Sequence, residues 1–439
     1  MHGRIKRWSI LIALALIVPT LAVAGTLRVQ AQDECAAGAT PTGDPVRIGV
    51  ILPLSGTAGT VGNDEKLALE LAVQIVNEAT PDLALPLAAT VGLPNLGCAQ
   101  VELIFADSQG KAEVGQSEAT RLIDQEQVVA LFGAYNSAVT KTASTAAERA
   151  GIPFLNAESS SPDLTERDFI WFFRTSPHDG TFSASIFDFI EYLNDEKGAG
   201  VESVGLMYED TDFGVNSAAA EKTEAEERGL EVMADVKYTA DATSLTSEIQ
   251  KLQADGGDVL IPSSYTSDSI LAVQTMEELG YLPKMIVAQN AGYADPAFIE
   301  AVGPLAEGIA TRSAFSIDIT GVKPVASQVN ELYRAVAEKD MYDVPARGFT
   351  GMMVLLDAIN RAGSTDPEAI RQALIETDLG IDDTIMPWEG VTFDQQQQNE
   401  LGVGIIVQIQ NGQYATVFPR EFAVEEVVFP LAPWDDRGA

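Results

Sequence analysis

Short apolar runs rich in β-branched residues alternate with amphipathic segments along this chain, and this alternation restricts the fold more than any other feature. The runs predict strands over residues 46–52, 101–106, 128–132, 153–157, 169–174, 201–208, 230–237, 259–262 and 285–288. The segments between them predict helices over residues 65–77, 112–125, 139–150, 182–194, 215–228, 245–255 and 269–279. Strands that alternate with helices build βαβ units, so we predict an α/β fold with mainly parallel sheets.

The size of the chain predicts two such sheets. A single hydrophobic core stops growing at about 250–300 residues, whereas this chain has 439 residues, of which 46% are hydrophobic. We therefore expect two Rossmann-like lobes. The first four βα units form one doubly wound lobe, and the units from about residue 201 form the other.

The helix predicted over residues 65–77 shows the pattern clearly. Leu67, Leu71 and Ile75 form one apolar stripe. Residues 62–64, Gly-Asn-Asp, are a typical helix start, and acidic side chains stabilise a helix N-terminus electrostatically. We therefore expect the helix to begin near Glu65, with acidic side chains at its N-terminus.

The first 31 residues are typical of a secretory signal peptide. They have a basic beginning, an apolar stretch over 10–18 and small residues before two candidate cleavage points, Ala24 and Ala31, of which we favour Ala31. The alternative is an uncleaved membrane anchor, but Pro19 interrupts an apolar stretch already shorter than the roughly 20 residues needed to span a bilayer. We therefore expect an exported protein, in the periplasm or at the cell surface.

The charge of the chain excludes one class of partner. Removal of residues 1–31 takes away four basic residues and no acidic one, so the formal charge changes from −37 to −41. A field of this sign repels nucleic acids and anionic lipid surfaces. We therefore expect no nucleic-acid partner.

Two cysteines, Cys35 and Cys98, remain after export. An even number of cysteines in an oxidising compartment predicts a disulfide, which would tie the polar tail of residues 32–44 to the first lobe. The alternative is lipidation of Cys35 at the mature N-terminus. The residues before it, Gln-Asp-Glu, disfavour this alternative because lipidation favours small or apolar residues there.

The order and spacing of several motifs resemble one protein family. The motifs are Val46-Arg-Ile-Gly-Val-Ile-Leu-Pro-Leu-Ser-Gly56 with Gly62, Phe105-Ala-Asp-Ser108, Gly133-Ala-Tyr-Asn-Ser-Ala-Val-Thr140, Gly151-Ile-Pro-Phe-Leu-Asn-Ala-Glu-Ser-Ser-Ser-Pro162, Phe173-Arg-Thr175, Asp212-Phe-Gly214 and Gly292-Tyr-Ala-Asp-Pro296. Each motif alone is weak, but together they cover residues 46–405. The chain resembles the branched-chain amino acid (leucine/isoleucine/valine) binding proteins of ABC transporters, which have the type I periplasmic binding fold.

The resemblance implies two α/β lobes joined by three hinge crossovers, with a solute held in the cleft between them. The crossovers are then expected near residues 175–179, 314–317 and 394–401. The first lobe is expected to comprise residues 45–177 plus 316–396, and the second residues 178–315 plus 397–439. The lobes would close over the solute by a hinge motion.

Three serines at strand ends are candidate ligand-binding residues. Ser137 follows a predicted strand and opens a helix, and Ser159 and Ser160 follow the next strand. Hydroxyl groups and free backbone N–H groups at such points form anion sites, although serine at a helix start often serves only as an N-cap. The resemblance implies that these three serines hold the α-carboxylate and part of the ammonium group of an amino acid.

Two aromatic residues, Phe213 and Tyr265, follow strand ends of the second lobe. Aromatic rings there offer apolar contact and, to a cation, the attraction of the ring face. Packing within the core is the alternative for both residues. Because ligands bind beyond the carboxyl ends of parallel strands, we expect both rings to cover the solute.

The chain departs from the pattern of the family at three positions. Asn290 stands where the family has an acidic partner for the α-ammonium group, and an amide cannot neutralise a buried cation. Asp179, at the expected hinge, is a candidate replacement. Val61 stands where an aromatic residue often lines the pocket, and Ser161 replaces a larger polar residue. A branched-chain amino acid, an amide and another small carboxylate therefore all remain candidate solutes.

Catalysis finds little support in the sequence. His178 is the only histidine after residue 31, and it lies in a Ser-Pro-His-Asp-Gly stretch typical of a turn. One histidine excludes histidine clusters for a metal. Gly56, Gly59 and Gly62 lack the spacing of a dinucleotide-binding loop, and no Gly-x-Ser-x-Gly nucleophile elbow is present. We expect no enzymatic activity, no metal and no cofactor.

The sequence therefore predicts an extracytoplasmic receptor that binds a small polar solute and presents it to an ABC permease and its ATPase. We expect this receptor to be a monomer. Two alternatives remain open: a ligand sensor on the same fold that is coupled to a signalling partner, and an exported α/β enzyme.

Overall fold

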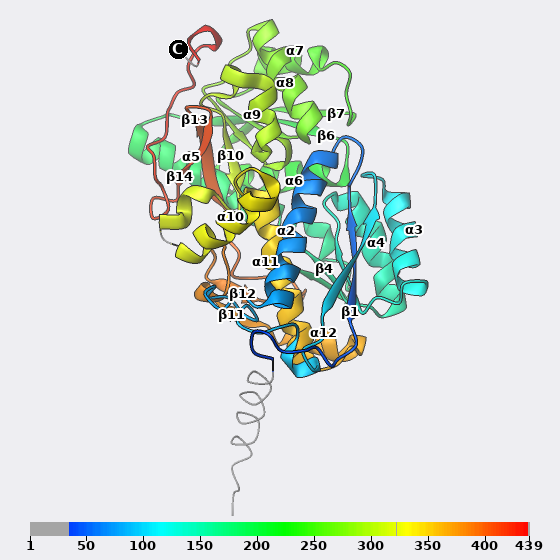
Figure 1. The fold of residues 1–439 in the computed structure, drawn as a ribbon. Helices are drawn as coiled ribbons and strands as arrows, with labels where there is room; N and C mark the ends of the chain where they lie inside the picture. The colour runs from blue at the N-terminus through cyan, green and yellow to red at the C-terminus, as the bar shows by residue number, and fades with distance from the viewer. Residues whose placement is uncertain (1–34, 322, 438–439) are drawn as a thin grey trace, which may run out of the picture.

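The computed structural model describes residues 35–321 and 323–437, which form two α/β lobes (Figure 1). The predicted two-lobed α/β fold with mainly parallel sheets is confirmed. The signal peptide predicted for residues 1–31 lies outside the described residues. Within the described residues, no helix is long and apolar enough to cross a membrane.

The first lobe contains a five-stranded sheet whose paired strands are all parallel, in the order β2-β1-β3-β4-β5. Its strands are β1 (Val46–Leu52), β2 (Val101–Asp107), β3 (Ala130–Gly133), β4 (Phe154–Asn156) and β5 (Phe172–Arg174). The strand order reverses between β1 and β3. In a doubly wound sheet, ligands bind beyond the carboxyl ends of the strands at this point of reversal.

Helices cover both faces of this sheet. They are α2 (Gly59–Glu78), α3 (Ala112–Asp124), α4 (Ser137–Ala150), α10 (Pro324–Ala337), α11 (Asp343–Ala362) and α12 (Pro367–Ile375). The buried residues of α2 and α11 share one hydrophobic cluster with the sheet, and those of α3 and α4 share another. A small hairpin of β11 (Asp378–Gly380) and β12 (Gly390–Thr392) lies near α12 (Figure 1).

The second lobe contains a seven-stranded sheet in the order β14-β13-β10-β9-β8-β6-β7. Its strands are β6 (Ser203–Glu209), β7 (Glu231–Tyr238), β8 (Val259–Ser263), β9 (Met285–Ala288), β10 (Ala310–Ser313), β13 (Ile405–Gln410) and β14 (Gln413–Phe418). The strands from β7 to β10 are parallel, and β13 and β14 are antiparallel. The order reverses between β6 and β8, so this sheet has its own point of reversal.

The helices of the second lobe follow its parallel strands. They are α5 (Asp179–Lys197), α6 (Asp212–Arg228), α7 (Thr246–Asp255), α8 (Thr266–Leu279) and α9 (Pro296–Val302). Most of the buried residues of this lobe form a hydrophobic cluster separate from those of the first lobe. Each lobe therefore has its own core, as the chain length predicts.

The chain passes between the two sheets three times: after β5, after β10 and after β12. The first and third passages are bound to each other. Arg174 is fully buried and donates from Nε to Oε1 of Gln398 at 2.6 Å, and Asn399 donates to the carbonyl oxygen of Thr175 at 3.0 Å. These bonds join segments that are far apart in the sequence into one connection.

The helix expected to begin near residue 65 begins at Gly59, so this prediction was wrong. Asp64 and Glu65 do not lie at its N-terminus and both are buried. Asp64 accepts hydrogen bonds from Nζ of Lys339 at 2.6 Å and from the hydroxyl of Tyr342 at 2.9 Å. Contacts with distant residues therefore stabilise Asp64 at an interior position of α2, although local capping rules predict that the helix begins there.

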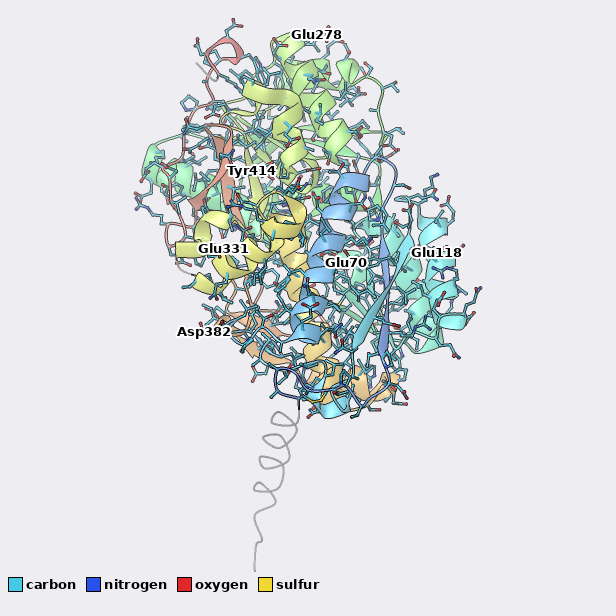
Figure 2. The ribbon with its side chains drawn as sticks, in the orientation of Figure 1. Glu70, Glu118, Glu278, Glu331, Asp382 and Tyr414 are labelled. Atoms are coloured by element: carbon cyan, nitrogen blue, oxygen red, sulfur yellow. A yellow bond between two sulfur atoms is a disulfide. The ribbon has the colours of Figure 1, made fainter. Side chains whose placement is uncertain are left out.

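A disulfide joins Cys35 to Cys98, with 5.5 Å between the Cα atoms. It fixes the start of the described chain to the loop before β2. Acidic side chains lie on the exposed surfaces of both lobes, for example Glu70, Glu278 and Glu331 (Figure 2). The large negative charge is therefore mostly solvated.

Candidate functional site

A small cavity lies between the two lobes, where their points of strand reversal face each other. Its volume is about 20 Å³, enough for about one water molecule. Ten residues from both lobes line it: Tyr135, Ser137, Glu158, Ser160, Phe213, Tyr265, Asn290, Ala291, Arg312 and Arg347. The structure thus places five predicted residues, namely Ser137, Ser160, Phe213, Tyr265 and Asn290, around one cavity.

Ser137 is the first residue of α4, just beyond the carboxyl end of β3. The N-cap is Asn136, and its side chain makes no capping hydrogen bond. The hydroxyl of Ser137 and the N–H groups of Ser137, Ala138 and Val139 have no hydrogen-bond partner within the described chain, since the first helical bond runs from Thr140 N to Asn136 O. Simple N-capping therefore does not account for Ser137, and a group of donors remains free at this helix start.

The other two serines have different surroundings. Ser159 is bonded to the carbonyl oxygen of Ala134 at 2.5 Å and to the hydroxyl of Thr140 at 2.6 Å, and it does not line the cavity. Ser160 lines the cavity and lies 3.5 Å from Nη2 of Arg312. Ser160 therefore remains the stronger candidate for contact with a solute.

Asp179 lies behind the cavity at the start of α5. It is fully buried, and its Oδ1 lies 3.3 Å from Nη2 of Arg312. Burial raises the pKa of Asp179, and Arg312 opposes this effect. Asp179 does not line the cavity. Its Oδ1 is engaged with Arg312, and its Oδ2 has no partner among the described residues.

Three aromatic rings from the two lobes meet over the cavity. The ring of Tyr265 lies 5.3 Å from that of Phe213 and 5.5 Å from that of Tyr135, measured between centroids. Phe213 and Tyr265 belong to the second lobe and Tyr135 to the first. Val61 packs against Tyr135 in the same buried cluster. These rings provide the apolar wall of the cavity.

Asn290 follows β9 and has a left-handed backbone conformation, with φ 66°. Its amide nitrogen donates to Oδ2 of Asp343 at 3.1 Å and to the carbonyl oxygen of Arg312 at 2.9 Å. Its amide oxygen accepts from N–H of Ala291 at 2.5 Å. The amide group is therefore bonded within the chain and orients Asp343.

Arg347, on α11, is the second buried arginine of the cavity. Its Nη2 lies 2.6 Å from Oδ2 of Asp343, and its Nη1 donates to the carbonyl oxygen of Glu158 at 2.9 Å. Burial opposes ionisation of Asp343, but Arg347, Arg312 and hydrogen bonds from the chain lower its pKa overall. Asp343 is therefore an anion held by chain donors.

Glu158 shares its surroundings with Glu65 of α2, and both are buried. Burial, followed by the charge of Glu158, raises the pKa of Glu65 well above its usual value. Burial raises the pKa of Glu158 to about 7, although Arg347 opposes this effect. The pair therefore holds at least one proton at neutral pH.

Sequence reasoning missed five residues of the cavity, namely Tyr135, Glu158, Arg312, Arg347 and the neighbour of Asn290, Ala291. The first two lie inside motifs that were recognised. The arginines lie on β10 and α11, which no strand or helix prediction covered. The sequence did contain a signal for them, namely an arginine within a largely apolar segment. Such an arginine is expected to be buried, and a buried charge needs partners nearby.

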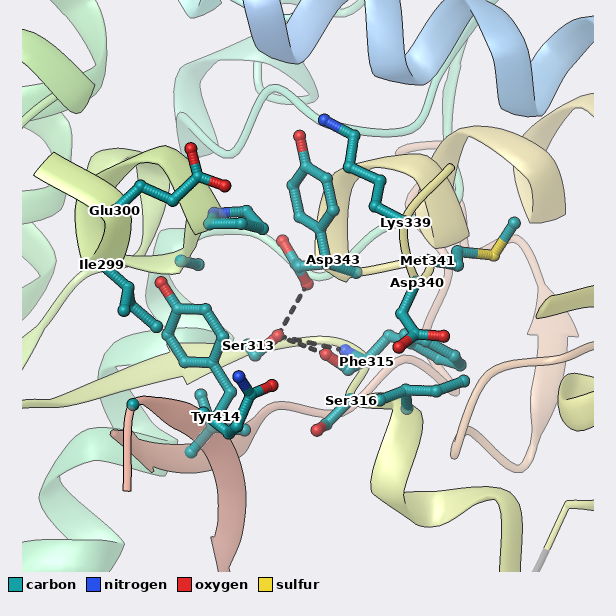
Figure 3. Close-up of a pocket in the computed structure, with 17 residues that line it drawn as sticks. Ile299, Glu300, Ser313, Phe315, Ser316, Lys339, Asp340, Met341, Asp343 and Tyr414 are labelled. Atoms are coloured by element: carbon teal, nitrogen blue, oxygen red, sulfur yellow. Dashed lines mark hydrogen bonds between the residues drawn. The ribbon is translucent and has the colours of Figure 1, made fainter. Parts of the chain in front are cut away.

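A larger pocket of about 360 Å³ lies between α9, the loop before α11 and the β13–β14 hairpin (Figure 3). Asp343 lines it and accepts from the hydroxyl of Ser313, as Figure 3 shows. None of the predicted ligand-binding residues lines this pocket. We assign the candidate site to the smaller cavity because free donors from two lobes converge there.

His178 caps α5, and its Nδ1 accepts from N–H of Gly180 at 3.0 Å. Burial, followed by the charge of Arg174, lowers the pKa of His178 to about 4, so it is neutral at neutral pH. Over the described ranges, no group of three or more His, Cys, Asp or Glu residues is placed to hold a metal ion.

Comparisons with known proteins agree with this geometry. The model of a family described as periplasmic binding protein matches residues 45–413. Leu/Ile/Val-binding protein homolog 7 of Brucella abortus is 29% identical over 406 residues, which cover 90% of this chain and 96% of the relative. The leucine-binding protein LivK of Thermotoga maritima has a TM-score of 0.72 at 22% identity, covering 84% of this chain and 97% of that chain. LivJ of Streptococcus pneumoniae, solved with isoleucine, has a TM-score of 0.71 at 21% identity, and the match covers 88% of this chain and 100% of LivJ.

Proposed function

Because this chain belongs to the periplasmic binding protein family, we propose that it is an extracytoplasmic receptor that binds a small polar solute between its lobes and delivers it to an ABC permease. The observation that carries this proposal is the meeting of Ser137 and Ser160 of the first lobe with Phe213 and Tyr265 of the second around one cavity. A site built from two lobes is completed only when they close.

The proposed cycle follows from the dimensions of the cavity. A volume of about 20 Å³ is too small for any amino acid, and the rings of Tyr135 and Tyr265 meet across the lobes. A solute therefore enters only when the lobes separate. Closure then places it against the donors of Ser137 and the start of α4, and the closed form is the one that the permease would recognise.

The proposal also includes the location, the partners and the candidate solutes of the receptor. We place it in the periplasm or at the cell surface, as a monomer whose partners are the solute and the permease with its ATPase. Charged residues on the lobe rims would guide docking to the permease. The branched-chain amino acids are the first solutes to test, because homologs of this chain are named for leucine, isoleucine and valine.

The first prediction concerns Ser137. We expect Ser137→Ala to weaken solute binding about tenfold or more, because a hydrogen bond to a charged group contributes about 1.5–3 kcal/mol. The unliganded melting temperature should stay unchanged, since the hydroxyl has no partner among the residues that the structure describes. The measurement is thermal shift of residues 32–439 against amino acids, amides, urea and small carboxylates, followed by calorimetric titration with each hit.

Ser117→Ala is the matched control, because Ser117 is exposed on α3 of the same lobe. This variant should bind as the parent does. The proposal fails if no solute of the panel stabilises the protein, or if Ser137→Ala and Ser117→Ala bind equally well.

A further inference from the structure

We infer that the solute of this cavity is an organic acid with a carboxylate and without an α-ammonium group. The inference rests on the proposed receptor function and names the class of solute for the same cavity. Its basis is that the hydrogen-bond donors and the hydrogen-bond acceptors around the cavity differ in how far the chain itself occupies them. The chain leaves donors around the cavity unused, whereas it fills the acceptors of Asp343 and Asn290, which an ammonium group could otherwise use.

The unused donors come from three elements. Nη1 of Arg312 and Nε of Arg347 have no hydrogen-bond partner among the described residues, although each arginine is only 2% exposed. The hydroxyl of Ser137 and the first three N–H groups of α4 also lack a partner within the described part of the chain. Buried donors without partners are costly, and a carboxylate is the acceptor that guanidinium and helix N-termini bind best.

The acceptors are largely filled by the chain itself. The carbonyl oxygen of Glu158 accepts from Arg347 at 2.9 Å. Asp343 accepts from Arg347, Asn290, Ser313 and the N–H group of Ala314. Asp179 is paired with Arg312 through Oδ1; its Oδ2 has no partner among the described residues, but Asp179 does not line the cavity. A ligand ammonium group would have to compete with two guanidinium groups for these oxygens, and it would add a third positive charge.

The environment of Asn290 explains why an acid is absent from that position. Its amide nitrogen lies 3.1 Å from Oδ2 of Asp343 and donates to it. A carboxylate at position 290 would place two anions in contact, which is unfavourable unless a cation lies between them. Arg347 already supplies the cation that Asp343 requires, so the side chain that pairs with Asp343 belongs to the protein and not to the solute.

Glu158 is the acidic residue that lines the cavity and has unfilled acceptors. Its two side-chain oxygens have no hydrogen-bond partner among the described residues, and its carboxyl group neighbours that of Glu65. Because this pair holds at least one proton at neutral pH, it does not provide the fixed double negative charge that would favour an ammonium group. It is suited to a hydroxyl or a second polar atom of the solute. The rings of Tyr135, Phe213 and Tyr265 are suited to an apolar part.

The test compares matched pairs of solutes that differ only in the ammonium group. The pairs are alanine and propionate, leucine and 4-methylpentanoate, and phenylalanine and 3-phenylpropanoate, measured by calorimetric titration of residues 32–439 at pH 7. We expect at least one acid to bind, and to bind ten times or more tightly than its amino acid. 4-Methylpentanamide should bind more weakly than 4-methylpentanoate, because it lacks the negative charge.

The outcomes separate this inference from the receptor proposal. If an amino acid or the amide binds as tightly as its matched acid or more tightly, the inference is wrong while the receptor proposal stands. The same holds if only uncharged or cationic solutes of the wider panel bind. If no solute of either panel binds, both proposals fail together.

A variant tests the role of Arg347 directly. Arg347→Met should weaken binding of the acid about 30-fold or more, since truncation of one partner of a buried charge pair is costly. It should also improve leucine relative to 4-methylpentanoate, because Asp343 and the carbonyl oxygen of Glu158 become available. The double variant Arg347→Met/Asp343→Asn, which keeps the charge balanced, should lose acid binding without any gain for leucine. It also provides the test if the single variant does not fold.

Arg371→Met is the control, because Arg371 pairs with Glu368 on α12, away from the cavity. It should bind the acid as the parent does. Unchanged binding of the acid by a folded Arg347→Met protein would overturn the assignment.

Discussion

At the scale of single residues, this protein buries ionisable side chains and gives most of them a partner. The side chain of Glu221 on α6 has fewer hydrogen-bond partners than those of the buried arginines. It is buried and accepts from the hydroxyl of Ser263 at 3.1 Å, while its Oε2 has no partner in the described chain. Burial raises the pKa of Glu221 to about 8, against the opposing effect of the bond from Ser263. The native state therefore prefers the protonated acid.

This preference predicts a pH-dependent effect of Glu221→Gln. The pKa of Glu221 is higher in the folded chain than the value of about 4.3 in the unfolded chain, so its contribution to stability is present at low pH and is lost as pH rises towards about 8. Glutamine does not titrate. We expect the variant to be more stable than the parent at pH 8 by about 2–4 kcal/mol, with little difference at pH 4, as measured by chemical denaturation.

Glu226→Gln, at an exposed position of the same helix, is the control for this experiment. It should show no such divergence between the two pH values. If Glu221→Gln raised the free energy of unfolding by the same amount at pH 4 and at pH 8, the side chain of Glu221 would not be titrating in this range.

The site could be predicted in part because some of its residues follow strand ends. Ser137, Ser160 and Tyr265 are each next to the carboxyl end of a recognisable strand, and parallel sheets bring such ends together. Arg347 comes from the second turn of α11 and reaches Glu158 across 189 positions of sequence. No local pattern encodes that contact, so the donors that distinguish this cavity are visible only in the structure.

At the scale of elements, the strands were predicted better than the helix starts. β1 and β9 begin and end where the apolar runs do, because a buried parallel strand is apolar along its whole length. Five of the seven predicted helices begin two to six residues before the predicted start, whereas α3 begins at the predicted residue and α7 one residue later. α2, for example, begins at Gly59, six residues before the expected Glu65, because its first turn is not apolar-periodic. α11 is buried almost all round, so polar residues such as Asp343 and Arg347 within it face buried partners and do not mark a solvent-exposed side.

The packing of α11 on α2 depends on a glycine. A Cβ atom at Gly348 would lie 2.9 Å from Cγ of Glu65, which is closer than non-bonded carbons approach. We expect Gly348→Ala to destabilise the protein. Overpacking costs about 1–3 kcal/mol, and the better helix propensity of alanine offsets up to about 1 kcal/mol of this cost. Chemical denaturation at pH 7 measures the change.

Gly59→Ala is the matched control, since a Cβ atom there would make only ordinary contacts, 3.6 Å from the nearest oxygen. It should leave stability unchanged or raise it slightly. If the Gly348→Ala protein were as stable as the Gly59→Ala protein, α2 and α11 could move apart without a loss of stability, and the close contact at Gly348 would not be required.

At the scale of the whole molecule, the lobes are joined by chain crossovers on one side and by side-chain contacts across the cleft. One such contact is an ion pair between Nζ of Lys141 on α4 and Oδ1 of Asp212 on α6, 3.1 Å apart. The two helices belong to different lobes and both begin beside the cavity. This pair therefore depends on closure in a way that pairs within a lobe do not.

A double-mutant cycle on this pair tests whether solute binding depends on the interlobe contact of the closed arrangement. Lys141→Ala and Asp212→Ala should each weaken binding of the tightest solute of the panel by up to about fivefold, because a partly exposed ion pair contributes about 0–1 kcal/mol. The second substitution should add little to the first, and the effect should fade at 1 M salt. The same cycle on Lys222 and Asp235, which pair at 2.6 Å within the second lobe, should leave affinity unchanged. Equal effects of the two pairs would mean that solute binding does not depend on the interlobe contact, and the closure mechanism would have to be abandoned.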